Sequence, residues 1–239
     1  MKKMFFLILL STSFLATANK NSLQNEKMYT DAMASYAALI GFDPLHGNVR
    51  GSLQSIQYVD DDVITKTFII SFDDTGCIQS VRWRNIWINE AFGDMKKVGD
   101  KLVTFRGKNK EELYLLDSKC KIIEDLKKND NYIYKNNLIS EVRNNGELLK
   151  SFEFNEKNEL IKIIEYGKPK LAQKFNHTSD SNKSPITLIH LYMNTELVAE
   201  EKITCHILDN HKNPLRCSST RRINSETKNI KYIYKTSYW

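Results

Sequence analysis

The sequence lacks the short motifs that mark the common enzyme classes. It has no nucleophile elbow, no phosphate-binding loop and no zinc-protease helix. Its 4 cysteines include no closely spaced CxxC pair of the kind that binds zinc. Beyond residues 1–18, no apolar stretch is long enough to cross a membrane as a helix. We therefore expect no catalytic residues, no cofactor and no bound metal, and we favour a protein that is not an enzyme.

The composition is that of a folded chain with a mild excess of positive charge. Hydrophobic residues make up 41% and charged residues 27%, which argues against wholesale disorder. The formal net charge is +6. In an exported protein such an excess favours solubility, and the alternative interpretation is attraction to anionic surfaces such as phospholipid headgroups. No nucleic-acid-binding motif is present, so no nucleic acid partner is expected.

The N-terminus predicts secretion. Lys2 and Lys3 form a positive start, Met4–Leu10 is an apolar run, and Ala16-Thr17-Ala18 fits the small-x-small cleavage pattern. We expect residues 1–18 to be a signal peptide cut after Ala18. An uncleaved anchor is the alternative, but the run is short for a bilayer span. No cysteine lies near the cleavage point, so a lipid anchor on a new N-terminal cysteine is not expected.

The four cysteines, Cys77, Cys120, Cys205 and Cys217, predict two disulfides. An even number in an oxidising compartment favours bridges over free thiols. Cys205 and Cys217 flank a turn-rich segment and resemble opposite strands of one hairpin. Cys77 and Cys120 each follow a turn, so they could meet across neighbouring strands. A metal or redox role remains the alternative.

Two regions are expected in the mature chain after cleavage. Residues 19–41 begin polar and then show a loose apolar helical stripe that Gly41 could end. Residues 42–239 form a β-rich domain. A join between two sub-sheets is expected near 167–185, because Gly167-Lys168-Pro169 and the polar run 176–184 look like loops.

From Val49 onward the pattern is that of successive β-hairpins. Apolar or aromatic residues alternate with polar ones, a polar turn follows, and a second alternating segment comes next. The predicted turns are 73–76, 117–119, 135–137, 155–158 and 209–214. The fold class is therefore mainly β: an antiparallel meander of hairpins, curled or sandwiched to hide its edges, with a short N-terminal helix.

A few polar clusters could carry chemistry. Asp60-Asp61-Asp62 could bind a cation, although a solvated turn explains it as well. His206, Asp209 and His211 are zinc-type ligands close in sequence, and a polar hairpin tip is the alternative. Asp43 and His46 could form an acid–base pair, or simply a structural turn. Trp83 and Trp87 could stack on sugars, or serve as core residues.

Several segments resemble the YnfC family of enterobacterial envelope lipoproteins. They are Met33-Ala34-Ser35-Tyr36, Phe42-Asp43-Pro44-Leu45-His46-Gly47, Gly76-Cys77, Lys119-Cys120, Cys205 to Cys217 through Asn213-Pro214, and Tyr232 to Tyr238. The resemblance spans most of the mature chain. It implies an envelope location and a β-rich fold, and it implies no activity. This chain departs from the family because it lacks the lipidated cysteine.

Taken together, the sequence favours a non-enzymatic periplasmic protein that binds an envelope component, either protein or glycan. The alternative is a structural protein associated with anionic membrane surfaces through its C-terminal basic residues, which are Arg216, Arg221, Arg222, Lys228, Lys231 and Lys235. A cell-wall or glycan hydrolase is the least favoured class, because the catalytic motifs are missing.

Overall fold

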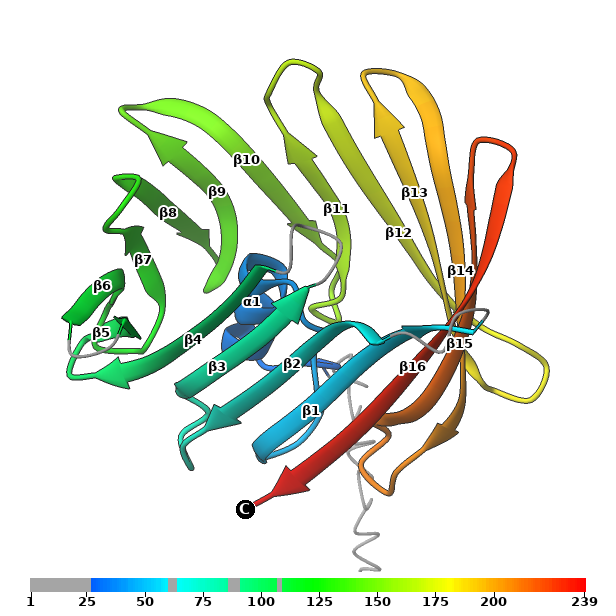
Figure 1. The fold of residues 1–239 in the computed structure, drawn as a ribbon, viewed down its shortest axis with the longest axis horizontal. Coiled ribbons are helices and arrows are strands. Elements are labelled where there is room, and N and C mark those ends of the chain that lie inside the picture. Colours follow the sequence, from blue (N-terminus) through cyan, green and yellow to red (C-terminus); the bar gives the residue numbers. More distant parts are fainter. Residues whose placement is uncertain (1–26, 60–63, 86–90, 107–108) are drawn as a thin grey trace, which may run out of the picture.

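The chain folds into a closed antiparallel β-barrel with one helix inside the ring of strands (Figure 1). This computed structural model describes residues 27–59, 64–85, 91–106 and 109–239. The predicted signal peptide, residues 1–18, lies outside the described residues. No helix in the described part of the chain is long and apolar enough to span a membrane.

The helix, α1, spans Asp31–Ile40 and has a defined cap at each end. The Thr30 side chain accepts a hydrogen bond from the Met33 amide, which is a typical N-cap. Gly41 adopts a φ of 86° and its amide donates to the Ala37 carbonyl, which ends the helix. The short N-terminal helix that ends at Gly41 is therefore confirmed.

Each strand pairs with its neighbours in chain order, and β1 pairs with β16 to close the ring. The strands are β1 (Val49–Tyr58), β2 (Ile64–Phe72), β3 (Ile78–Asn85), β4 (Ala91–Val98), β5 (Lys101–Arg106), β6 (Asn109–Leu116), β7 (Ile122–Asp125), β8 (Asp130–Lys135), β9 (Leu138–Asn144), β10 (Glu147–Phe154), β11 (Leu160–Glu165), β12 (Leu171–Ser179), β13 (Pro185–Met193), β14 (Glu196–Leu208), β15 (Pro214–Ile223) and β16 (Glu226–Tyr238).

The mainly β prediction is confirmed, and the structure is more specific than the predicted curled or sandwiched meander. Closure removes both free edges, which is the most complete protection that a sheet can have. The polar run 176–184 was expected to be a loop, and that prediction is wrong for its first four residues. Asn176, His177, Thr178 and Ser179 belong to β12 because they pair in register with β13. Near 167–185 the sheet is therefore continuous.

A repeated side-chain-capped turn closes the hairpins at one end of the barrel. The side chain of an Asp or Asn at the first position accepts hydrogen bonds from the amides of the third and fifth residues. The fourth residue has a positive φ, and is glycine only at Gly76. The turns begin at Asp73, Asp117, Asn155, Asp180 and Asp209. Each follows an even-numbered strand, so all of them lie at the same end.

Residues 29–47, which we call the plug, fill part of the barrel next to these turns. The fully buried Asn213 side chain accepts from the His46 amide and donates to the His46 carbonyl. Asn158 donates to the Tyr29 carbonyl, and the Tyr36 hydroxyl donates to the Cys120 carbonyl. The turns therefore hold the plug in place while they close the hairpins.

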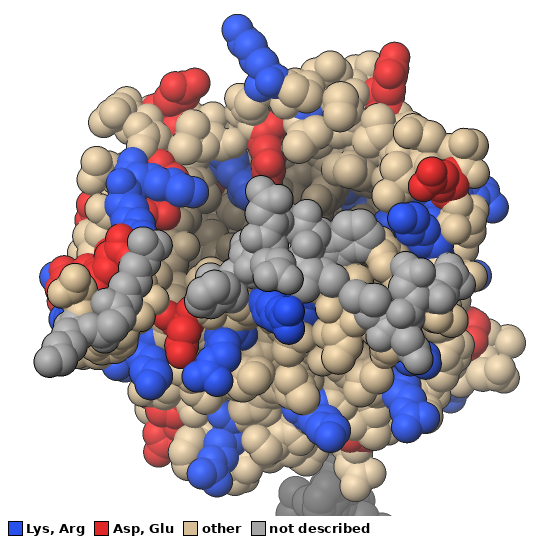
Figure 2. Space-filling view, viewed as in Figure 1, with Lys and Arg blue, Asp and Glu red and all other residues tan. Residues whose placement is uncertain are grey.

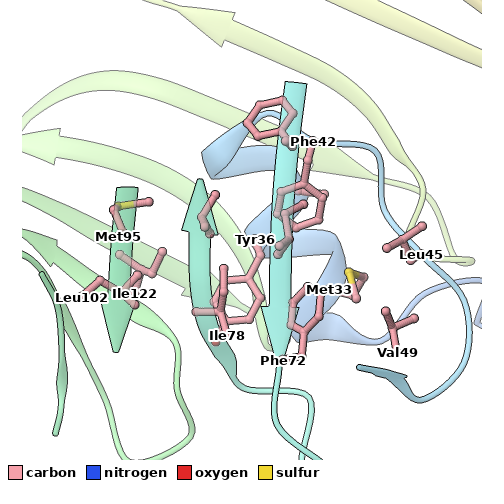
Figure 3. Packing of buried hydrophobic residues seen from close by; sticks show 14 of the residues in the cluster. Met33, Tyr36, Phe42, Leu45, Val49, Phe72, Ile78, Met95, Leu102 and Ile122 are labelled. Atoms are coloured by element: carbon pink, nitrogen blue, oxygen red, sulfur yellow. The ribbon is translucent and has the colours of Figure 1, made fainter. Parts of the chain in front are cut away.

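The main core lies between the plug and the strands β1 to β7. Met33 and Tyr36 of α1 pack with Phe42 and Leu45 of the following segment against the inner face of the sheet (Figure 3). The strand residues of this cluster are Val49, Phe68, Ile70, Phe72, Ile78, Val81, Met95, Leu102, Leu116 and Ile122. In β2 the buried residues alternate with more exposed ones, as expected when one face is packed and the other faces outward.

The structure pairs Cys77 with Cys120 and Cys205 with Cys217, the pairing that the turn positions suggested. The first bridge joins the turns after β2 and β6, which are not neighbouring strands. The second lies across the β14–β15 hairpin, where the two cysteines face each other in register.

We predict that the two bridges stabilise the fold unequally. Their sequence separations are 43 and 12 residues, and a bridge across a longer loop removes more entropy from the unfolded chain. Replacing Cys77 and Cys120 with Ala should therefore lower the free energy of unfolding by about 1 kcal/mol more than replacing Cys205 and Cys217. Urea unfolding of the two double variants measures the difference, and a larger loss for the Cys205–Cys217 pair would contradict it.

Candidate ligand-binding site

The inner face of the barrel can be followed from strand to strand. Phe152 of β10 is buried in a cluster that packs against α1, so its side chain points inward. Side chains at facing positions of neighbouring strands share a face of the sheet. From Phe152 the register runs through Ile163, Gln173, Leu191 and Ala199 on β11 to β14. These side chains therefore point into the barrel as well.

The plug fills only one half of this interior. On β2, Phe68, Ile70 and Phe72 are buried against it. The strands β11, β12 and β13 are described throughout, and none of their residues is buried. Their inward side chains keep part of their surface accessible, and only Leu160 and Ile163 of these strands pack against a core cluster of the described residues. Figure 2 shows a hollow in the molecule below the upper ends of these strands.

We call this open half of the interior the lumen. One side of it is mainly apolar. The apolar inward residues on β11 to β14 are Ile163, Leu171, Phe175, Ile189, Leu191, Ala199 and Ile203. The polar ones include Gln173, Thr187, His177, which faces Thr187, and Glu165, which faces Leu171. A concave, mostly apolar surface with a few polar groups is typical of a binding site for a small molecule.

The other side of the lumen carries a buried polar cluster around Glu201. This carboxylate is 6% exposed and accepts hydrogen bonds from Ser219 Oγ at 2.6 Å and Tyr232 Oη at 2.5 Å. Arg221 completes the set with an ion pair, 2.6 Å from Nη2 to Oε2. Burial raises the pKa of the Tyr232 hydroxyl, so it stays protonated and donates to Glu201. The Glu201 charge is thus fully compensated inside the sheet wall.

A second carboxylate, that of the half-buried Asp43, lies where the plug meets this wall. Tyr234 donates to Asp43 Oδ2 at 2.6 Å, and Gln54 holds the Asp43 backbone through two hydrogen bonds of 2.8 Å. Burial raises the pKa of the Asp43 carboxyl, and the Tyr234 hydrogen bond opposes this only in part. A cavity of about 30 Å³ lies beside it, lined also by Phe42, Phe68 and Tyr232. Asp43 is therefore deep in the barrel yet reachable by a molecule the size of water.

Cationic side chains lie on the same wall. Lys66 Nζ donates to the Gly41 carbonyl at 3.1 Å and lies 4.6 Å from the centre of the Phe68 ring. Lys228 faces Arg221 across β15 and β16, and its Nζ lies 5.3 Å from the centre of the Tyr58 ring. Burial lowers the pKa of the Lys66 ammonium, and Asp43 opposes this shift.

The structure does not join the candidate residues from the sequence into an active centre. Asp43 bonds to Tyr234, while His46 packs on the Tyr29 ring at 4.8 Å, so each has a structural role. His211 stacks on Tyr238 at 3.8 Å. His206 hydrogen-bonds to Ser218, and Asp209 Oδ2 accepts from the Tyr238 hydroxyl. Among the described residues no group of three His, Cys, Asp or Glu side chains could hold a metal ion.

The possible cation site and one of the two tryptophans that could stack on sugars cannot be placed in the structure. Asp60-Asp61-Asp62 and Trp87 are outside the described residues. Trp83 faces Gly93 on the neighbouring strand, and a Cβ at Gly93 would stand 2.0 Å from its ring. The ring therefore lies flat over a glycine and packs against the main core. This packing is the core role weighed for Trp83.

The C-terminal basic residues divide between the two faces of the sheet. Arg221 and Lys228 point into the lumen, because each lies two residues from an inward position, Ser219 and Ile230 respectively. The others alternate with these inward positions and point outward: Arg216, Arg222, Lys231 and Lys235.

Glu201, Tyr232, Asp43 and Lys66 were not predicted as a group. Their one sequence signal is a charged residue at an inward position of an alternating strand, as Glu201 is between Ala199 and Ile203. Using that signal requires knowing which face of the strand is inward, and only the register of the closed barrel tells this.

Comparison with known proteins gives a family but no activity. The model of the uncharacterised protein family UPF0257 matches residues 1–234, and the chain belongs to this family. No match was found among curated proteins. Among solved structures, the chain is similar to a porin-like protein from Bacteroides uniformis, with 10% identity and a TM-score of 0.35. The similarity covers 81% of this chain and 99% of that one.

We predict that Asp43 makes stability depend on pH. The pKa of the Asp43 carboxyl is raised in the folded protein, so folding is favoured when Asp43 is protonated. This contribution to stability is present at acid pH and is lost as pH rises through the folded-state pKa. Asn at this position can still accept from Tyr234 and carries no charge. Asp43→Asn should therefore raise the melting temperature more at pH 8 than at pH 4. The exposed Asp94→Asn serves as control, and an equal effect at both pH values would contradict the prediction.

Proposed function

We propose that this protein is a non-enzymatic binding protein of the cell envelope that holds an apolar small molecule in the lumen of its barrel. The observation that carries this proposal is the half of the interior that no described segment fills. An apolar surface of this kind inside a folded protein is stabilised when another apolar molecule covers it.

The outer face of the barrel supports a protein whose outside meets water. Ionised side chains occupy facing outward positions, such as Arg82 with Asp94, whose side chains are 63% and 42% exposed. Lys162 and Glu153 form a similar pair on β11 and β10. A barrel wall that faces lipid carries apolar side chains at such positions. The two disulfides support an oxidising compartment, which agrees with secretion through the predicted signal.

The test is binding of a neutral apolar dye, N-phenylnaphthylamine, whose fluorescence rises on burial. We expect the native protein to bind it and Ile189→Gln to bind about tenfold more weakly, since a polar group replaces an apolar contact. Leu188→Gln is a matched control, because Leu188 is adjacent in sequence, is half-buried and points outward. No dye binding by the native protein, or an equal loss in both variants, would contradict a lumen site.

A second function, association with an anionic surface, is favoured by the outer face of β14 to β16. Lys202, Arg222, Lys231 and Lys235 are exposed and project from the same side of neighbouring strands, as does Arg216. Such a basic face attracts anionic headgroups over roughly a Debye length, about 10 Å at 0.1 M salt.

For this second function we expect binding to vesicles that contain phosphatidylglycerol at low salt, and release as salt rises. Replacing Lys231 and Lys235 with Glu should abolish binding, because both charges on the outer face are reversed. The inward Lys228→Gln is the control and should leave vesicle binding unchanged. Co-sedimentation measures the bound fraction, and binding only to neutral vesicles would count against the idea.

A further inference from the structure

The two disulfides differ in the side chains that surround their sulfur atoms. Lys97 Nζ lies 3.1 Å from Cys77 Sγ and 3.6 Å from Cys120 Sγ. The Cys205–Cys217 bridge instead lies in a cluster of apolar and aromatic side chains. A nearby cation lowers the pKa of a thiol, whereas apolar surroundings raise it. The two bridges should therefore differ in how readily one of their sulfurs leaves as a thiolate.

Lys97 reaches the first bridge from the inner face of β4. It faces Leu102, which is fully buried in the main core, so both side chains lie on the inner face. The Lys97 charge also acts on the Asp73 carboxylate, whose Oδ1 accepts hydrogen bonds from the Thr75 and Cys77 amides. The ammonium is thus shared between a hydrogen-bonded carboxylate and the two sulfurs, and it favours negative charge on the closer sulfur, that of Cys77.

A cavity gives access to the bridge. Its volume is about 280 Å³, and it is lined by both cysteines, by the exposed turn residues Ser118 and Lys119, and by Tyr36 of the plug. Cys77 is only 3% exposed, whereas Cys120 is half-buried. A thiolate that enters this cavity therefore reaches Cys120 more easily than Cys77.

We propose that the Cys77–Cys120 bridge is a site of thiol–disulfide exchange whose reaction partner is a small thiol. The partner's thiolate forms a bond to Cys120 Sγ, the bond between the two cysteines breaks, and its electron pair leaves on Cys77 Sγ. Lys97 stabilises this leaving thiolate, which raises the rate of exchange. A second thiolate then attacks the mixed disulfide. The two partner thiols are oxidised to one disulfide, and the bridge takes up two electrons and two protons.

Exchange at this bridge removes a constraint beside the plug. The bridge joins the turns after β2 and β6, and the Tyr36 hydroxyl donates to the Cys120 carbonyl. Opening the bridge frees these two turns from each other where they contact α1. The rate of exchange in the folded protein is separate from the stability that the bridge provides, because that stability depends on the unfolded chain. The proposal is also independent of a ligand in the lumen.

The experiment compares the two bridges within one folded molecule. The mature protein is incubated with reduced glutathione under native conditions, exchange is stopped with acid, and free thiols are alkylated with N-ethylmaleimide at mildly acid pH. Peptide masses then give the opened fraction of each bridge with time and show which cysteine carries glutathione.

We expect Cys77–Cys120 to open about tenfold faster than Cys205–Cys217, because its leaving thiolate lies beside a cation and its other sulfur is accessible. In the mixed disulfide, glutathione should be found on Cys120 and the alkyl group on Cys77.

Lys97→Met removes the charge and keeps a long side chain. It should slow the opening of Cys77–Cys120 about threefold, as expected if the pKa of the leaving thiol rises by about one unit, and leave Cys205–Cys217 unchanged. Lys96→Met is the matched control, because Lys96 is adjacent in β4 and exposed, and it should change neither rate.

Three results would each overturn the proposal. They are opening of Cys205–Cys217 at an equal or higher rate, glutathione found on Cys77 rather than Cys120, and an equal effect of the two lysine variants. A change of rate in Lys97→Met that both bridges share reflects a loosened fold rather than the lost charge, and it overturns the role of Lys97.

Discussion

The structure depends on how a ring of sixteen strands is filled. Eight strands enclose a space that inward side chains can fill, whereas sixteen enclose far more. This chain meets the excess volume with its own N-terminal segment, which packs α1 and the residues up to Gly47 against β1 to β7. The plug is too small for the whole interior. The half-filled barrel, with its core on one side and its lumen on the other, follows from that mismatch.

The position of the plug depends on the hairpin turns. Asn213 and Asn158 each belong to an Asx-capped turn and also hold backbone groups of the plug. These turns therefore satisfy two sets of polar groups at once, those of the hairpin and those of the buried segment. Buried backbone amides and carbonyls without partners would be costly, so the turn sequences at this end are constrained by the interior as well as by the chain reversal.

Much of the local structure could be predicted from the sequence, because local structure has local causes. Alternating aromatic and apolar residues around Asp and Asn turns indicated the hairpins, and Gly41 indicated where the helix ends. The turn at 209–214 was recognisable although Lys212 occupies the positive-φ position, since Asp209 supplies the capping hydrogen bonds. Where local signals mislead, as at Asn176–Ser179, pairing with the neighbouring strand overrides a polar composition.

The lumen could not be predicted, because it arises from pairings between distant residues. Nothing near Val49 indicates that it will pair with the strand ending at Tyr238. Whether Glu201 or Lys202 points inward depends on the register of the closed ring, and a shift of one residue exchanges the faces. The basic C-terminal residues show the effect, since their alternation sends Arg221 and Arg222 to opposite sides of the same strand.

The pairing of the first strand with the last has a consequence for how the chain matures. The plug segment is synthesised early, whereas β16, which closes the barrel, is synthesised after all the other described strands. Until β16 (Glu226–Tyr238) is present, β1 presents a row of unpaired backbone amides and carbonyls. Such long-range closure is slow compared with hairpin formation. Truncation of β16 would therefore leave an open sheet with exposed edges on β1 and β15, and such edges favour aggregation.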